Sequence, residues 1–517
     1  MFRTLVGKEI AETMLGLRFA IATLLCMVLI PLGMYVSRKD YEHRLASYQG
    51  ELQTYKERFG TPPTPLTGGE EAQGFRPPSV LSIFASGLDP FMPDKVFTSQ
   101  SGLFRTVKES GIDNPQSLLF GKVDFLFNVM FIISLAALIF TFNSISGERE
   151  KGTLRLMIAH SIPRSRILLS KIVGKYIVLL VPFMISVFIA LLVLDASPVV
   201  SIGSPEVWPP LLVILMVTLL FIFSMVSLGV CISTFTSHSM GSIVLLFFVW
   251  AMFIIGVPRM SPMIAESIYP VESGSVFSFR KRMVRDDIEK QFEQVKKETI
   301  DSKWDKERDI VQEMQLKASN ELANRMKALG REVSFEVVKE DPDFRKLRKK
   351  FNQKYQELRD KYEPQVEHLF NQCQRRIASE LNRIEQDYRN RRNIQFSIAT
   401  NLARISPVSC YAYIVSGLSG TGVAEPDNFV RNARMFQEDI NQIFYDKVFH
   451  LFGQQGRQRR AEGFNVSDSL SFPDMRYRFL NLTEAVQMHW PDILLLCLFD
   501  VLFCTLALMR FNRYDVR

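Results

Sequence analysis

Residues 211–231 read LLVILMVTLLFIFSMVSLGVC, an apolar run without a single charged residue. A bilayer core about 30 Å thick needs about 20 such residues in a helix, so this run predicts a membrane span. Further apolar runs lie at 19–36, 125–142, 177–194, 243–257 and 493–509. The sequence therefore predicts a mainly α membrane protein with six transmembrane helices, of which the fifth is short.

The first apolar run has two interpretations. Basic residues precede it, as they do in a secretory signal, but the run is long and no clear small-residue cleavage site follows it. We therefore expect it to be retained as the first span.

Basic residues gather in three short segments, and short basic loops mark the cytoplasmic side of a membrane. The sequence thus predicts a multi-pass protein of the bacterial cytoplasmic (inner) membrane with both termini in the cytoplasm. The net charge of +8 follows from this topology and does not indicate nucleic-acid binding. The residues are Arg3, Lys8 and Arg18; Arg149, Lys151, Arg155, Arg164, Arg166, Lys171 and Lys175; and Arg510, Arg513 and Arg517.

These spans divide the chain into five parts. Residues 1–36 hold the N-terminus and the first span, and residues 37–124 form a first extracytoplasmic region with a Pro- and Gly-rich connector at 60–69. Spans two to five occupy 125–257 and enclose a cytoplasmic coupling segment at 143–171. A large extracytoplasmic domain follows at 258–492, and 493–517 hold the last span and a cytoplasmic tail.

A long, highly charged stretch lies within the large extracytoplasmic domain. Apolar residues recur three or four positions apart from 279 to 329, with a slip near Ile300, and again from 344 to 388. This spacing predicts amphipathic helices, which we expect to form a long antiparallel hairpin at about 279–404, joined at 330–343 and kinked or restarted at Pro364. The hairpin can be a solvated stalk or a surface for a partner or substrate.

Catalytic chemistry is absent from the sequence patterns. Gly147 and Gly152 have the glycine spacing of a phosphate-binding loop, but no lysine follows the second glycine, so this segment is not predicted to bind ATP. The histidines are scattered, and no spacing justifies a metal site. Cys373 and Cys410 both fall on the outer side, where a disulfide is permitted. Their distance apart cannot be read from the sequence.

Asp500 lies near the middle of the last span, where an acidic side chain costs about 2.5–3.5 kcal/mol. Such a residue should face protein or a water-filled cavity. One hypothesis is that Asp500, with Asn128, lines a translocation cavity or meets a partner span. The alternative is a protonated or hydrogen-bonded packing residue, with Asn128 or Ser227 as its neighbour.

Three segments resemble those of ABC-2 type transporter permeases: GEREKGT at 147–153, PRSRILLSK at 163–171 and FNRYDVR at 511–517. The chain is more narrowly similar to the branch of multicopper-enzyme maturation and nitrous-oxide reductase accessory permeases. RPPSVLSIFASGL at 76–88 and SGTG at 419–422 extend the similarity to members with large extracytoplasmic insertions. The charged hairpin has no place in the family pattern, and no Met/His/Cys cluster supports a copper role.

The resemblance implies a permease dimer that docks a separate cytoplasmic ABC ATPase dimer through short coupling helices. The second permease copy can be identical or different. ATP and Mg²⁺ would bind the ATPase, and this chain would carry no cofactor and no catalytic residue. The implied docking element comprises Gly147, Glu148, Arg149, Glu150, Lys151, Gly152 and Thr153, with the glycines permitting tight turns. For Arg164, Arg166 and Lys171 we prefer contact with lipid headgroups.

Two functions from different classes follow from these expectations. In the first, the chain is the permease subunit of an ABC transporter that exports or extrudes an apolar or amphipathic substrate, since charge is scarce inside the spans. In the second, nothing crosses the membrane: the ATPase motion is transmitted through the outer domain to a periplasmic or envelope partner. In both, the chain itself is not an enzyme.

Overall fold

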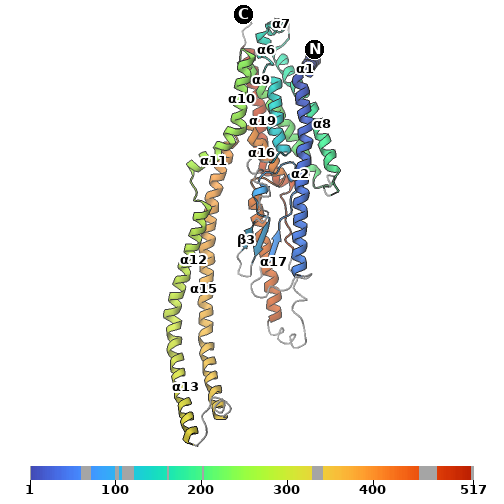
Figure 1. The fold of residues 1–517 in the computed structure, drawn as a ribbon. Coiled ribbons are helices and arrows are strands. Elements are labelled where there is room, and N and C mark those ends of the chain that lie inside the picture. Colours follow the sequence, from blue (N-terminus) through green and yellow to red (C-terminus); the bar gives the residue numbers. More distant parts are fainter. Residues whose placement is uncertain are drawn as a thin grey trace. The chain divides into compact units, whose positions relative to one another are not determined.

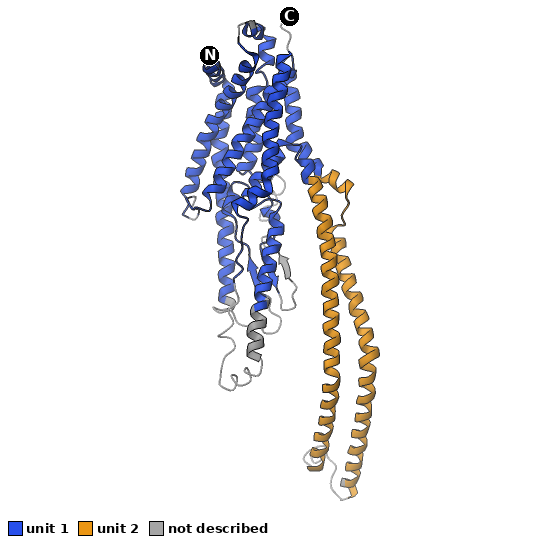
Figure 2. Cartoon of the chain, turned by 180° about the vertical axis from the view of Figure 1, so that it is seen from behind, with its two compact units in different colours: residues 1–261, 400–517 blue, residues 262–399 orange. Residues whose placement is uncertain are grey.

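The computed structural model describes residues 2–59, 72–98, 104–107, 122–159, 162–198, 200, 203–328, 342–452 and 474–513. The chain forms two compact units, shown in different colours in Figure 2. Unit 1 comprises residues 1–261 and 400–517, and unit 2 comprises residues 262–399.

Unit 1 contains the membrane bundle. Among the described residues, 6 helical segments are long and apolar enough to cross a membrane, which confirms the predicted class of mainly α membrane protein. A short helix α1 (Phe2–Met14) precedes them. The segments are α2 (Leu17–Phe59), α4–η3–α5 (Phe125–Phe127, Asn128–Ile133, Ser134–Thr141), α8 (Arg164–Asp195), α9 (Trp208–Phe235), α10–η4–α11 (Ser239–Ala251, Met252–Gly256, Val257–Ile268) and α19 (Leu482–Asn512).

Helix α9 is apolar on all sides, and its C-terminal half, residues 221–234, is almost entirely buried in the bundle, whereas Leu212 and Met216 nearer its start are exposed. It packs against α5, α8, α19 and the short apolar helix α16 (Pro407–Leu418). Phe221 of α9 stacks on Tyr411 of α16 with ring centroids 4.4 Å apart. The Tyr411 hydroxyl lies 3.0 Å from the hydroxyl of Thr218, so its buried polar group is satisfied.

Gly229 marks the closest approach of α5 and α9. A Cβ atom there would lie 1.8 Å from Oγ1 and 2.7 Å from Cβ of Thr141. We expect Gly229→Ala to force the helices apart and to lower stability by about 1–3 kcal/mol. The measurement is thermal unfolding in detergent. The matched control is Gly241→Ala in α10, where a Cβ meets nothing within 4 Å. Equal unfolding midpoints for the two variants would contradict this packing.

Beyond the bundle, unit 1 carries a small sheet domain that the sequence patterns did not predict. Strands β1 (Ala72–Phe75), β2 (Lys95–Thr98) and β3 (Phe104–Val107) form an antiparallel sheet in the order β1-β2-β3. The 3-10 helices η1 (Val80–Ile83) and η2 (Asp89–Phe91) lie between the first two strands. Helix α17 (Glu425–Phe452) completes the domain, and its Phe429, Ala433, Phe436 and Ile440 share a buried core with Ala72, Met92 and Val96.

Unit 2 is the expected hairpin. One arm is α12–η5–α13 (Gly274–Lys296, Lys297–Asp301, Ser302–Ala328), and the other is α15 (Pro342–Ala403), whose last residues belong to unit 1. Figure 1 shows the arms side by side. At 1.5 Å per residue the first arm is about 80 Å long. Two buried clusters join the arms: Ile300, Val311, Phe351, Leu358 and Tyr362, and Ile288, Cys373, Ile377 and Leu381.

The slip in the apolar pattern near Ile300 has a structural cause. Residues Lys297–Asp301 form a π-helical turn, which adds one residue to a helical turn and brings Ile300 back into the buried seam. The helix does not restart at Pro364, because α15 runs unbroken from Pro342 to Ala403. Pro364 is exposed, so water can satisfy the carbonyl group that loses its donor. The expected connectors at 60–69 and 330–343 fall largely outside the described residues.

Cys373 and Cys410 are both free, so the disulfide that their outer placement permits is not formed. Cys373 belongs to the buried seam of the hairpin, roughly 39 Å along α15 from the end of unit 2. Cys410 lies in α16 of unit 1, where its thiol donates to the carbonyl of Arg404. Two thiols bridge only when their Cα atoms lie within about 7 Å.

Candidate functional site

The coupling segment folds as two short helices at the end of unit 1 that also carries α1 (Figure 1). They are α6 (Ser146–Glu150) and α7 (Thr153–Ala159). Gly152 lies between them with φ of +76°, a left-handed conformation that strains any side chain, so this glycine makes the expected turn. Gly147 lies within α6 and permits close packing, because a Cβ there would be 3.2 Å from Asn143 Cβ.

A buried ion cluster anchors this segment. Lys171 of α8 is 2 % exposed, and its ammonium donates to Glu148 of α6 at 2.6 Å and to Glu9 of α1 at 2.8 Å. Lys175 lies 3.8 Å from the second oxygen of Glu9 and donates to Thr13 at 2.7 Å. The cluster holds two lysines and two glutamates, so it is formally neutral. One lysine therefore connects α1, α6 and α8.

The burial of Lys171 corrects the expectation that it contacts lipid headgroups. The α1 helix covers it: a Cβ added at Gly174, one turn along α8, would lie 2.7 Å from Glu9 Cβ. Glu9 was not singled out from the sequence. The sequence does contain a feature that could have indicated it. Lys171 and Lys175 lie one turn apart on α8, and the segment around them has no acidic residue, so if they are buried their carboxylate partners must come from another helix.

The other charged residues of α6 also contact neighbouring helices. Arg149 donates to the carbonyl of Thr236, just after α9, at 3.0 Å. Glu150 accepts from the backbone N–H and the hydroxyl of Ser239, which opens α10, at 3.1 and 2.8 Å. A carboxylate at a helix N-terminus is favourable because it satisfies free N–H groups. Three of the residues expected to dock a partner thus hold the segment in place.

The surface of the coupling segment lies C-terminal to these anchors. Lys151, Gly152, Thr153, Arg155 and Leu156 are exposed, and Leu156 is 68 % exposed. This surface therefore combines one exposed leucine with two cations and the glycine turn. Among the expected docking residues, only Lys151, Gly152 and Thr153 belong to this surface.

Asp500 and Asn128 have different surroundings. Asp500 is 6 % exposed, and neither of its oxygens has a hydrogen-bond partner among the described residues. It lies beside Ser224 of α9 and near Tyr176 of α8. The Asn128 amide donates to the carbonyl of Leu29 in α2 at 3.2 Å. The described contacts do not bring the two residues together.

A buried salt bridge ties the start of the last span to the end of α15. Asp492 of α19 is fully buried and accepts two hydrogen bonds from Arg404, at 2.6 and 3.1 Å, in a bidentate pair. His489 lies 3.1 Å from the same carboxylate. Ser406 caps α16 and donates to the carbonyl of Phe253 at 2.8 Å. The turn at 404–406 therefore joins α15, α16, α19 and the π-helical turn η4 of the fifth span.

The sheet domain has its own buried polar cluster. Asp89 accepts from both Arg44 and Arg76, and Glu425 accepts from the Tyr477 hydroxyl at 2.6 Å. Burial raises the pKa of Glu425, with Tyr477 and Asn428 acting against it. Burial alone would lower the pKa of Arg76, but Asp89 outweighs it and the pKa is raised. The cluster connects α2, η2 and α17 and is best explained as structural.

Together the bundle and the coupling segment define a multi-pass membrane protein whose second and third spans are joined by a compact, exposed helical element. The whole length of the chain matches one protein family: residues 3–516 match ABC-2 family transporter proteins. The chain belongs to this family and is a membrane permease rather than an enzyme. A comparison with curated proteins gives no match. Groups of three or more metal-ligating side chains are absent from the described residues.

Proposed function

We propose that the chain is the permease subunit of an ABC transporter driven by a separate cytoplasmic ATPase dimer. ATP and Mg²⁺ bind on that ATPase, and the coupling segment is its docking element. The observation that carries this proposal is the anchoring of α6 to α1, α8, α9 and α10, while the Gly152 turn and one side of α7, with Arg155 and Leu156, stay exposed. A segment fixed to four helices moves them when it is pushed.

The proposal includes the expected topology. The coupling segment and both termini face the cytoplasm, and the sheet domain and the hairpin lie outside the bacterial inner membrane. A second permease copy, identical or related, completes the assembly within the membrane lipid. The exported substrate is apolar or amphipathic, because Asp500 is the one carboxylate in the middle of a described span. Asp500 would then line the translocation path or meet the partner span.

A second function is favoured by a different observation. The end of the hairpin arm α15 is fixed to the last span by the buried Arg404–Asp492 pair. A rigid helix attached to a span in this way can transmit force to an envelope partner without transport. Reconstituting the permease with its ATPase separates the two functions. Stimulation of ATP hydrolysis by candidate lipid substrates supports export, and hydrolysis that responds only to an envelope fraction supports force transmission.

Docking itself is tested with a double variant of the exposed surface. We expect Arg155→Glu with Leu156→Ala to weaken co-purification of the ATPase by about tenfold or more, since interface centres carry most of the binding energy. The matched control is Arg166→Glu, an exposed charge reversal at the start of α8, outside α6 and α7. Retention of full ATPase binding by the double variant, or equal loss in the control, contradicts docking at α7.

A further inference from the structure

The charge of the hairpin is unevenly distributed. Residues 345–354 of α15 include six basic residues and no acidic residue, namely Arg345, Lys346, Arg348, Lys349, Lys350 and Lys354. We call these six residues the basic band. Two longer stretches of the hairpin are balanced: residues 276–312 carry ten basic and nine acidic residues, and residues 363–399 carry six basic and five acidic residues. An ordinary solvated stalk does not require this concentration at one end.

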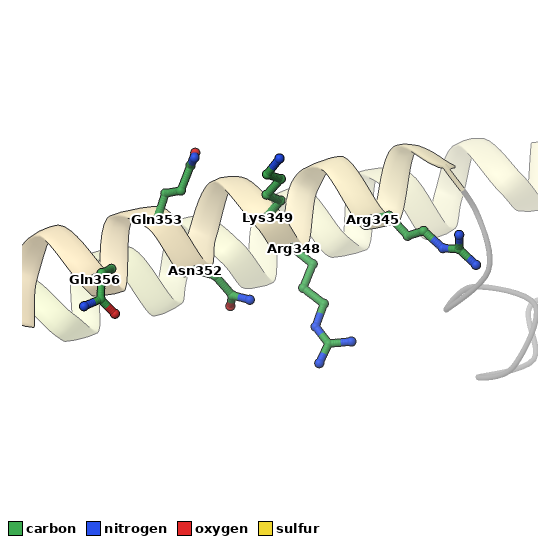
Figure 3. A pocket seen from close by; sticks show the side chains of 6 residues that line it. All are labelled: Arg345, Arg348, Lys349, Asn352, Gln353 and Gln356. Atoms are coloured by element: carbon green, nitrogen blue, oxygen red, sulfur yellow. The ribbon is translucent and has the colours of Figure 1, made fainter. Parts of the chain in front are cut away.

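The basic band covers the solvent side of α15. Leu347, Phe351 and Leu358 turn toward the other arm and belong to the apolar seam. Five members of the band are exposed, and Lys354 is half-buried. Arg345, Arg348 and Lys349, with Asn352, Gln353 and Gln356, line a shallow groove of about 410 Å³. Figure 3 shows these side chains projecting from the helix on more than one side.

The band has a single ion pair among the described residues. Its one ion pair there joins Lys346 to Asp343 at 3.9 Å, between two exposed side chains. Elsewhere on the hairpin some bases pair with acids, as in the pairs Lys361–Glu307 at 2.7 Å and Lys281–Glu385 at 3.1 Å, and others form no ion pair among the described residues. Like charges one helical turn apart repel each other, so an anion bound along this face would reduce that repulsion.

We propose that the basic band binds an anionic polysaccharide of the cell envelope. The band offers repeated cations for carboxylate or phosphate groups, and the three carboxamides of the groove offer donors and acceptors for sugar hydroxyls. It has no exposed aromatic or aliphatic anchor between 342 and 356, which disfavours a protein interface. An interfacial membrane helix needs an exposed apolar face, and here that face packs on the other arm.

The envelope origin of the polymer rests on the proposed function, which places the hairpin outside the inner membrane. The binding test does not depend on it. Full-length protein in phosphatidylcholine nanodiscs is titrated against labelled polygalacturonate, with neutral dextran of equal length beside it. We expect binding to polygalacturonate alone, with an affinity that falls steeply between about 50 and 200 mM salt, as counterion release requires.

The decisive variant replaces all six basic residues with glutamine, which keeps the helix propensity. We expect the affinity to fall by about tenfold or more and the salt dependence to flatten. The matched control replaces Arg375, Arg376, Arg383, Arg389, Arg391 and Arg392 with glutamine, removing the same charge from the same helix. It should bind nearly as the unaltered chain does. If the six-fold variant does not fold, the triple variant Arg345→Gln, Arg348→Gln and Lys349→Gln replaces it.

Several outcomes overturn the proposal. They are absence of binding by the unaltered chain, equal losses in the band and control variants, and equal binding to polyglutamate or to phosphatidylglycerol vesicles. ATP hydrolysis with the partner ATPase is measured on the same variants. Normal ATP hydrolysis together with lost polymer binding in the six-fold variant supports polymer binding by the basic band and leaves the proposed function intact. Normal polymer binding with no ATPase coupling would instead count against the proposed function alone.

Discussion

Replacing Lys171 with methionine is expected to destabilise the protein by about 3–5 kcal/mol, because the buried Glu9 and the half-buried Glu148 lose their cation. Glu9 and Glu148 approach the Lys171 ammonium at 2.8 and 2.6 Å. In the variant the nearest remaining cation of the cluster is Lys175, which lies 3.8 Å from Glu9. The measurement is thermal and denaturant unfolding in detergent, followed by helical signal.

A second variant separates the charge effect from the loss of the lysine stem. Lys171→Met with Glu148→Gln leaves Glu9 facing Lys175, so the cluster is neutral again. We expect it to recover more than half of the lost stability, because no buried carboxylate is left without a cation. If the double variant is as unstable as the single one, packing of the lysine stem matters more than charge.

The same pair of variants tests how the coupling segment works. In both, α6 is no longer held to α1 and α8 by Lys171. If the anchored segment transmits the ATPase motion, stimulation of ATP hydrolysis by substrate stays lost in the double variant although the fold has recovered. Recovery of both stability and stimulation would show that the ion cluster only stabilises the fold.

Replacing Arg404 with methionine is expected to have a similar effect, about 3–5 kcal/mol, because Asp492 is fully buried. The remaining neighbour, His489, offers one contact at 3.1 Å in place of the bidentate pair. Arg404→Lys should cost less, since it keeps the charge and loses only the forked geometry. In unfolding experiments in detergent we expect the unaltered chain to be the most stable, Arg404→Lys to be less stable and Arg404→Met to be the least stable.

The matched control adds Asp492→Asn to Arg404→Met, which removes the buried charge. Stability should then recover by more than half. A double-mutant cycle with a coupling near zero would show that the two residues do not depend on each other. If the turn at 404–406 carries force between the hairpin and the last span, an envelope fraction should still fail to stimulate ATP hydrolysis in the double variant, although its stability has recovered.

The membrane bundle could be predicted from the sequence because its signal is local. An apolar run such as 211–231 is long enough to cross a bilayer whatever its neighbours are, and only a helix satisfies its backbone there. The hairpin could be predicted for the same reason, since its apolar residues recur at helical spacing. Even the π-helical turn was visible as a slip in that spacing near Ile300.

The sheet domain could not be predicted because its strands are short. Each has four residues, and β1 and β2 are separated by 3-10 turns and by loops. Four residues carry too little alternation to be distinguished from a loop, and their pairing depends on burial against α17. The same holds for Cys373 and Cys410, whose separation depends on an unbroken helix across Pro364.

Some features of the candidate site also follow from the sequence, and others depend on the tertiary structure. Its place in the chain, its glycines and its charge density follow from the sequence alone, because they are properties of one short segment. The roles of its charges were decided by tertiary structure, because each partner comes from a distant helix. Glu9 lies 162 positions from Lys171, and Ser239 lies 89 positions from Glu150. No local pattern encodes such contacts, so only the packed bundle shows which charges anchor the segment and which stay exposed.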